Sequence, residues 1–256
     1  MVLGQGVGET WDTYIASYEN NKMGTTLLRM DLKEIAPLKD FSYVLVTGVT
    51  YEGDKNGMPD NQTLLTLYEI EEDVVKIIKS QFGGIYAGSF MCNNERLTYS
   101  YLKSNQGVKE SLNKLYDTKY IKYKKYINLK EDPEWKYYLE FLYPNDNIIN
   151  YNEDQKVVMS LEKNGDDLKK VRRIDHWAYF DLEIDTRKFE VEIQKQGYKT
   201  EEISKDAKDT HSYKIQFWKD GFVDLKSINK VTVEMRTMVK IYNGVYDGWE
   251  TVVLKN

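Results

Sequence analysis

Residues 41–51 read FSYVLVTGVTY, a run of β-branched and aromatic residues that predicts a strand. A helix is expected next, over residues 61–79, because Leu64, Leu67 and Ile78 recur at helical spacing. This strand and this helix open a series of elements that the chain runs through twice. The series indicates the fold better than any single motif does.

The first half of the chain predicts the order strand, helix, strand, strand, helix, strand. After the two elements above, we expect strands at 85–91 and 96–102, a helix at 108–116 and a strand at 119–127. This is the order of the ferredoxin-like plan, in which two crossovers place both helices on one face of an antiparallel sheet. An additional hairpin is expected ahead of it, with strands at 11–18 and 25–32 and a turn at 19–22.

The second half repeats this order. We expect strands at 176–184, 198–203, 212–219 and 245–254, and helices at 187–196 and 228–242. The first of these helices is ambiguous, because Phe189, Val191 and Ile193 alternate at period two whereas Phe189 and Ile193 alone suit a helix. The parallel with the first half favours the helix. The predicted fold class is α+β, with two consecutive ferredoxin-like (βαββαβ) α/β sandwich domains built on antiparallel sheets.

The same elements predict the domain organisation. A first domain is expected over residues 1–145, a helical connection and linker over 146–172, and a second domain over 173–256. The charged stretch NGDDLKKVRR, residues 164–173, has few apolar anchors and is the expected linker.

Composition excludes several classes of protein. The 256 residues are 41% hydrophobic and 30% charged with only 4 prolines, so the chain is neither collagen-like nor intrinsically disordered. No window approaches about 18 uncharged apolar residues, so no membrane partner is expected. The single cysteine, Cys92, cannot form an intramolecular disulfide, and with only two histidines the usual zinc ligands are missing. We expect a cytoplasmic protein with no cofactor and no metal.

Catalytic chemistry finds little support in the sequence. His176 could act as a base, but no residue stands at a spacing that gives it a defined partner, so a structural role is favoured. Asp166-Asp167 and Glu201-Glu202 are adjacent acidic pairs, and the side chains of adjacent residues usually diverge. We therefore predict no catalytic residue, and keep an unrecognised hydrolase as an alternative.

The best candidate for RNA binding is KYIKYKKY, residues 119–126, which interleaves rings with Lys119, Lys122, Lys124 and Lys125. Proteins that bind single-stranded nucleic acid typically stack aromatic rings on the bases and neutralise the phosphates with ammonium groups. The formal charge of −5 argues against direct nucleic-acid binding, and lysines that protect a sheet edge explain the pattern better. An RNA-binding protein is kept as a second alternative.

The segment NGVYDGWET, residues 243–251, places Tyr246 and Trp249 in a short space. Such rings can anchor a partner or cap a core, and the pattern favours the two equally. For a shared surface the rings need a bulge near Gly248, because residues three apart point to opposite sides of a regular strand. The partner-binding surface that we predict consists of Trp177, Tyr179, Tyr246, Asp247, Trp249 and Glu250.

The C-terminal part of the chain resembles the B-type regulator of ribonuclease E activity (RraB) family. The resemblance covers residues 175–254 and rests on HWAYF (176–180), the segment from Phe189 that ends in QGY, and YDGWET (246–251). It implies a ferredoxin-like α/β sandwich. It also implies a regulator that binds the endonuclease and restrains RNA decay without chemistry of its own.

The N-terminal part looks like the domain of unknown function 695 family. The resemblance covers residues 11–143 and rests on WDTYIASYEN (11–20), SYVLVTGV (42–49) and ERLTYSYL (95–102). It implies no activity. The expected function is therefore that of a non-catalytic regulatory protein that binds a protein partner, a ribonuclease; no motif specifies an oligomeric state.

Overall fold

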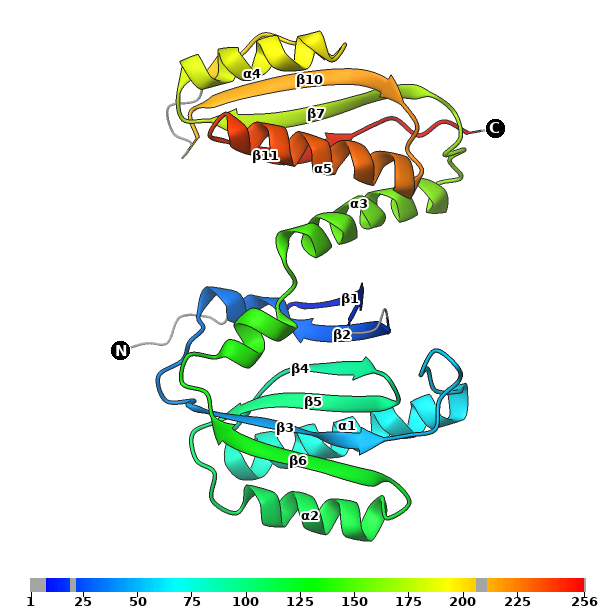
Figure 1. Ribbon diagram of the computed structural model, residues 1–256, viewed down its shortest axis with the longest axis vertical. Coiled ribbons are helices and arrows are strands. Elements are labelled where there is room, and N and C mark those ends of the chain that lie inside the picture. Colours follow the sequence, from blue (N-terminus) through cyan, green and yellow to red (C-terminus); the bar gives the residue numbers. More distant parts are fainter. Residues whose placement is uncertain (1–7, 19–21, 206–210, 256) are drawn as a thin grey trace. The chain divides into compact units, whose positions relative to one another are not determined.

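The chain divides into two compact units, Met1–Pro144 and Asn145–Asn256, each with its own antiparallel sheet (Figure 1). The structure, a computed structural model, describes residues 8–18, 22–205 and 211–255. The turn expected at 19–22 falls mostly outside these described residues. Helices alternate with antiparallel strands in both units, so the predicted α+β class is confirmed.

The first unit contains a six-stranded sheet in the order β1-β2-β4-β5-β3-β6, in which every neighbouring pair is antiparallel. Its strands are β1 (Trp11–Ser17), β2 (Met23–Arg29), β3 (Tyr43–Thr50), β4 (Ile85–Cys92), β5 (Glu95–Leu102) and β6 (Lys124–Glu131). Its helices are α1 (Asn61–Phe82) and α2 (Val108–Lys119), with short helical segments η2 (Met30–Glu34) and η3 (Tyr137–Leu142). The expected N-terminal hairpin is present and extends the sheet beyond β4.

Local chemistry sets the limits of α1. The Asp60 side chain accepts a hydrogen bond from the Thr63 backbone amide at 2.7 Å, and Gly83 ends the helix in the left-handed conformation at φ 59°. Val74 and Ile78 are fully buried in a cluster that includes Leu45 of β3. The helix therefore packs on the sheet through the apolar face that its sequence spacing predicts.

The opposite face of the first sheet is also packed. Tyr101 of β5 stacks on Trp135 with ring centroids 3.8 Å apart, and its hydroxyl donates to the Asp132 carboxylate at 2.7 Å. Tyr138 of η3 donates from its backbone amide to the Tyr101 hydroxyl at 3.1 Å. The segment that follows β6 is thereby held against the sheet.

The second unit contains a smaller sheet in the order β11-β7-β10-β8, with β9 paired to β10. Its elements are α3 (Asp146–Lys163), β7 (Arg172–Phe180), α4 (Glu183–Lys195), β8 (Lys199–Thr200), β9 (Ser204–Lys205), β10 (Tyr213–Gly221), α5 (Leu225–Ile241) and β11 (Gly244–Glu250). The ambiguous segment is helix α4, because Phe189 and Ile193 are buried against β7 and β10 while Val191 is exposed. The expectation of a helix at 187–196 is confirmed.

Several element boundaries differ from the sequence prediction. The strand expected over 176–184 lies at 172–180 as β7, because α4 already begins at Glu183, and the strand expected over 245–254 ends at Glu250. The strand expected over 119–127 begins at Lys124, because α2 continues to Lys119 and a turn follows, in which the Tyr123 amide donates to the Tyr120 carbonyl at 2.9 Å. Of the strand expected over 198–203, only the two residues of β8 are extended, and the two-residue strand β9 lies beyond its expected end. Most of these differences lie at the ends of elements, where pattern and propensity are least decisive.

The residues expected as a linker are tied into the second unit. Arg172 forms a buried ion pair with Asp166, and the same carboxylate accepts a hydrogen bond from the Leu254 amide at 2.7 Å. The Arg172 hydrogen bond holds the pKa of Asp166 below its usual value. The charged residues of this stretch therefore hold the C-terminal segment in place and do not form a free linker. Residues 146–172 belong to the second unit.

Candidate functional site

The two faces of the second sheet have different characters. Along β7, His176, Ala178 and Phe180 are buried, whereas Trp177 and Tyr179 between them are half-buried. The buried residues share clusters with α3, α4 and α5, so these helices cover what we call the inner face. The outer face carries the alternate residues.

Strand β11 contains the bulge that the sequence requires. Tyr246 pairs with Ala178 and Gly248 with Trp177, so Asp247 is left over and the register shifts between them. The shift brings Tyr246 and Trp249 to one face of the strand. That face is the inner one, because Trp249 lies opposite His176.

The prediction that Trp249 belongs to an exposed surface is wrong. Its side chain is only 8% exposed and packs in a cluster with Val158 and Leu161 of α3 and Ile174 of β7. Tyr246 is mostly buried against the same inner face. Both rings cap the core, which is the alternative that the sequence left open. Asp247 and Glu250 are exposed.

A buried carboxylate fixes the Trp249 ring. The indole Nε1 donates to Asp154 Oδ1 at 3.0 Å, and Asn229 Nδ2 donates to Asp154 Oδ2 at 3.1 Å. Thr232 donates its hydroxyl to the same Oδ2. Arg236 of α5 also lies 3.8 Å from Asp154 Oδ1. The four partners of this α3 carboxylate lie on α5 and β11, so one side chain joins three elements.

Sequence reasoning missed Asp154. It stands four and seven residues before Val158 and Leu161, both buried, and so shares their face of α3. An acidic residue on an apolar helical face is the signal that could have found it. A buried carboxylate of this kind needs several donors, which it has here.

His176 is a core residue. Its Nδ1 lies 2.8 Å from the Tyr246 hydroxyl, and its ring stacks on Phe217 with centroids 5.3 Å apart. Burial lowers the pKa of His176 to about 4, against a smaller opposing effect of the Asp175 charge. The imidazole is therefore uncharged at neutral pH, and its environment is that of a packed ring.

The outer face presents a row of aromatic rings on the two central strands. Trp177 and Tyr179 come from β7, and Trp218 comes from β10, where it pairs with Asp175. All three rings are half-buried. Sequence reasoning missed Trp218, although it alternates with the buried Phe217 and therefore had to point outward.

Cations lie over these rings. Lys214 Nζ is 5.5 Å from the centre of the Tyr179 ring, and Arg173 Cζ and Lys199 Nζ are 4.3 and 4.4 Å from that of Trp218. Arg173 is itself bound to the Asp175 carboxylate at 2.6 Å. These contacts fix the rings without covering them with a helix, so the outer face is a preformed, amphipathic surface.

The four lysines proposed for RNA do not act as one cationic surface. Lys119 forms an ion pair with Asp73 at 2.6 Å, and Lys125 forms one with Asp117 at 2.7 Å. Lys122 lies in the turn before β6, and Lys124 neighbours Lys125 on the strand, so the two point to opposite faces. Half of the expected positive charge is therefore neutralised within the chain.

In residues 8–18, 22–205 and 211–255, histidine, cysteine and carboxylate side chains form no group of three that could hold a metal ion. Over the same ranges, none of the helices has the length and apolar character needed to cross a membrane.

Family models match both parts of the chain. Residues 9–143 match the model of a family of unknown function, DUF695, over more than half of the sequence. The chain belongs to the DUF695 family. Residues 151–251 match the model of the family described as regulator of ribonuclease activity B. This second match runs from within α3 to just past β11 and therefore takes in both Asp154 and Trp249.

Other comparisons add little. No curated protein matches the sequence. The crystal structure of an unknown protein from Galdieria sulphuraria is similar at 9% identity, covering 83% of this chain and 99% of that one with a TM-score of 0.23. A likeness at this level supports no inference about function.

Proposed function

We propose that the protein is a non-catalytic regulator that binds a ribonuclease of the RNase E type and restrains its cleavage of RNA. The match of residues 151–251 to the regulator of ribonuclease activity B is the observation that carries this proposal. The buried, uncharged imidazole of His176 agrees with a role that needs no acid or base. The same family match supports a cytoplasmic location.

Both units are proposed to be ferredoxin-like sandwiches. With the two short strands β8 and β9 counted as one, the strands of the second sheet lie in the order fourth, first, third, second along the chain. Strands β3 to β6 of the first sheet lie in the same order when read from the β6 edge. In this plan the helices occupy one face of the sheet. The outer face of the second sheet is then the natural place for a partner.

The proposed interface is centred on Trp177, Tyr179 and Trp218. Tryptophan and tyrosine are the residues that most often dominate binding energy at protein interfaces, because they bury a large area with few rotatable bonds. Val245 of β11 is 48% exposed and pairs with Tyr179, which extends the apolar area of the same face. The exposed Glu250 lies beside Asp175 at its margin.

The proposal is tested by measuring binding between the full chain and a purified RNase E-type endonuclease by calorimetry. Replacing both Trp177 and Trp218 by alanine should weaken binding by about 2 kcal/mol or more, which is roughly thirtyfold. Tyr126→Ala is the matched control, because Tyr126 is an exposed aromatic on β6 of the first unit. Equal binding by the double variant and the wild type would exclude the outer face as the interface.

Hydrogen exchange of the complex gives a second readout. Backbone amides of β7 and β10 should become protected when the endonuclease is added, whereas α1 should be unchanged. RNA cleavage by the regulator alone, abolished by one Asp or His substitution, would refute the non-catalytic role itself.

A further inference from the structure

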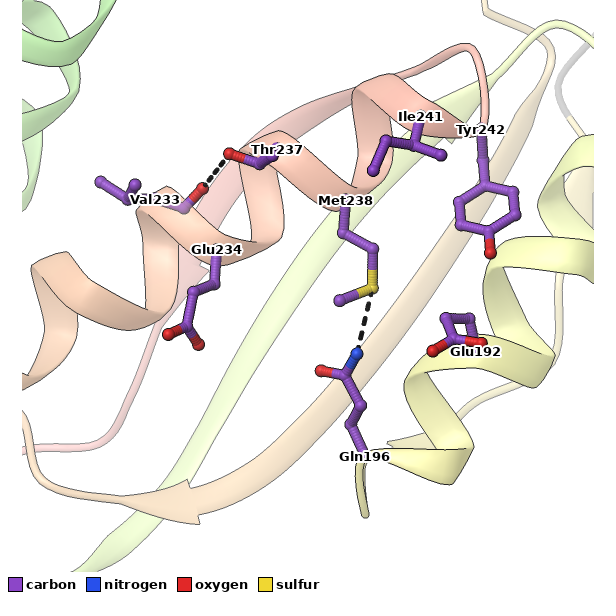
Figure 2. Close-up of a pocket in the computed structure, with 8 residues that line it drawn as sticks. All are labelled: Glu192, Gln196, Val233, Glu234, Thr237, Met238, Ile241 and Tyr242. Carbon is purple, nitrogen blue, oxygen red and sulfur yellow. Dashed lines mark hydrogen bonds between the residues drawn. The ribbon is translucent and has the colours of Figure 1, made fainter.

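The helical side of the second unit carries a groove that the proposed function does not use. It lies between α4 and α5, and Figure 2 shows Met238 of α5 pointing toward Gln196 at the end of α4. Gln196 Nε2 lies 3.9 Å from Met238 Sδ. The hollow measures about 490 Å³ and opens to solvent. It lies on the helix-covered side of the sheet, away from the outer face.

The sequence of α5 explains why the groove is apolar. One stripe of the helix, with Met235 and Val239, is buried on the sheet. A second stripe, with Val233 and Ile241, follows at eight-residue spacing and remains 39% and 70% exposed. A helix that needs only one apolar stripe for its own packing has no folding reason to carry a second. Thr237 lies between these two residues, and Met238 and Tyr242 continue the lining of the groove on the side of α4.

The charges at the groove have a single sign. Two charged side chains line it, Glu192 from α4 and Glu234 from α5, and both are acidic. Glu192 also contacts the exposed Lys195 at 3.1 Å, an ion pair that a stronger partner can replace at little cost because such surface pairs contribute little. The groove thus combines an apolar floor with an acidic rim.

We propose that this groove binds an amphipathic helix of a partner protein whose apolar row is flanked by lysine or arginine. A groove between two neighbouring helices accepts anchors spaced three, four or seven residues apart on a bound helix. Met238 supplies a flexible, polarisable side chain that can adjust to the shape of such anchors. Glu192 and Glu234 attract flanking cations and disfavour an acidic helix, which gives the site its selectivity.

The hollow is too small for a whole helix and large enough for a few side chains. The partner helix therefore lies across α4 and α5 and inserts only its anchors. Ile241, at the end of α5, is more exposed than Val233 and is therefore the main apolar contact offered to the partner helix. This site is independent of the proposed ribonuclease interface, since it uses none of the outer-face rings.

Two synthetic peptides test the proposal on the full chain. Both carry the same leucine row at helical spacing; one has lysine flanks and the other has glutamate flanks. The lysine peptide should bind and shift the amide resonances of Val233, Met238 and Ile241, and the glutamate peptide should bind at least about tenfold more weakly. No ribonuclease is present, so the result does not depend on the proposed function.

Variants locate the binding. Ile241→Ala should lower the affinity for the lysine peptide about tenfold. The double variant Glu192→Gln with Glu234→Gln should lower it by about the same factor. Ile184→Ala is the matched control, because Ile184 is 61% exposed on α4 and does not line the groove. Equal affinity for both peptides, no binding of either, or binding that Ile241→Ala leaves intact would each overturn the proposal.

Discussion

Replacement of Trp249 by phenylalanine tests whether this ring belongs to the core. The change removes the hydrogen bond to Asp154 Oδ1, which is 3.0 Å long, and leaves a gap where the indole packed against Val158 and Leu161. Loss of a hydrogen bond to a buried carboxylate lowers the free energy of unfolding by about 1–3 kcal/mol. The smaller phenylalanine ring also leaves a cavity, which lowers it further. We expect the free energy of unfolding of the second unit to fall by about 2–4 kcal/mol.

The matched control makes the same chemical change on the outer face. Trp177→Phe leaves a half-buried ring in place and should lower the free energy of unfolding by less than about 1 kcal/mol. Because the chain has two units, unfolding in urea should be followed by hydrogen exchange of peptides from α5, which report on the second unit alone. Equal losses for the two variants would refute the assignment of Trp249 to the core.

Three further outcomes follow from the structure. The pKa of His176 is about 4 in the folded state and 6.5 in an unfolded chain, so only the unfolded state takes up a proton between these values. Stability of the second unit should therefore fall by about 3 kcal/mol from pH 6.5 to pH 4, and His176→Phe should remove this dependence in urea titrations. Glu71→Gln should cost the first unit about 3–5 kcal/mol in the same assay, because it leaves the buried Arg96 guanidinium without its carboxylate. Gly48→Ala should prevent soluble expression or lower the melting temperature sharply, because the added methyl carbon would lie 1.9 Å from the Arg96 carbonyl oxygen.

The element order was predictable because periodicity is a local property. Leu67 and Ile78 on α1, and Ile228 and Val239 on α5, fall on buried faces that their spacing alone specifies. The repeat of the series resolved α4, where local pattern was ambiguous. The start of β6 depends on where the preceding helix α2 ends. The residue pattern of the strand itself carries no information about the end of that helix.

The direction of the β11 rings was not predictable in the same way. The sequence required a bulge for Tyr246 and Trp249 to share a side, and the bulge is present at Asp247. Which side they share depends on where α3 packs, a long-range contact made by Asp154 and Val158. Strand patterns fix relative orientation within a strand, whereas burial is decided by distant elements.

The outer face could have been found only in part. Trp177 and Tyr179 follow from alternation along β7, and Trp218 joins them through the register of β10 with β7. Register between strands far apart in sequence leaves no mark in either strand alone. Sequence reasoning therefore found two of the three rings and grouped them with Tyr246 and Trp249, which lie on the inner face.

Inhibition of RNA cleavage is the decisive measurement for the proposed function. The rate at which a purified RNase E-type endonuclease cuts a single-stranded RNA should fall as the full chain is added. The double variant Trp177→Ala with Trp218→Ala should need at least about tenfold more protein for the same inhibition, while Tyr126→Ala behaves as the wild type. An endonuclease that cuts at the same rate with and without the wild-type chain would contradict a regulator of this enzyme class.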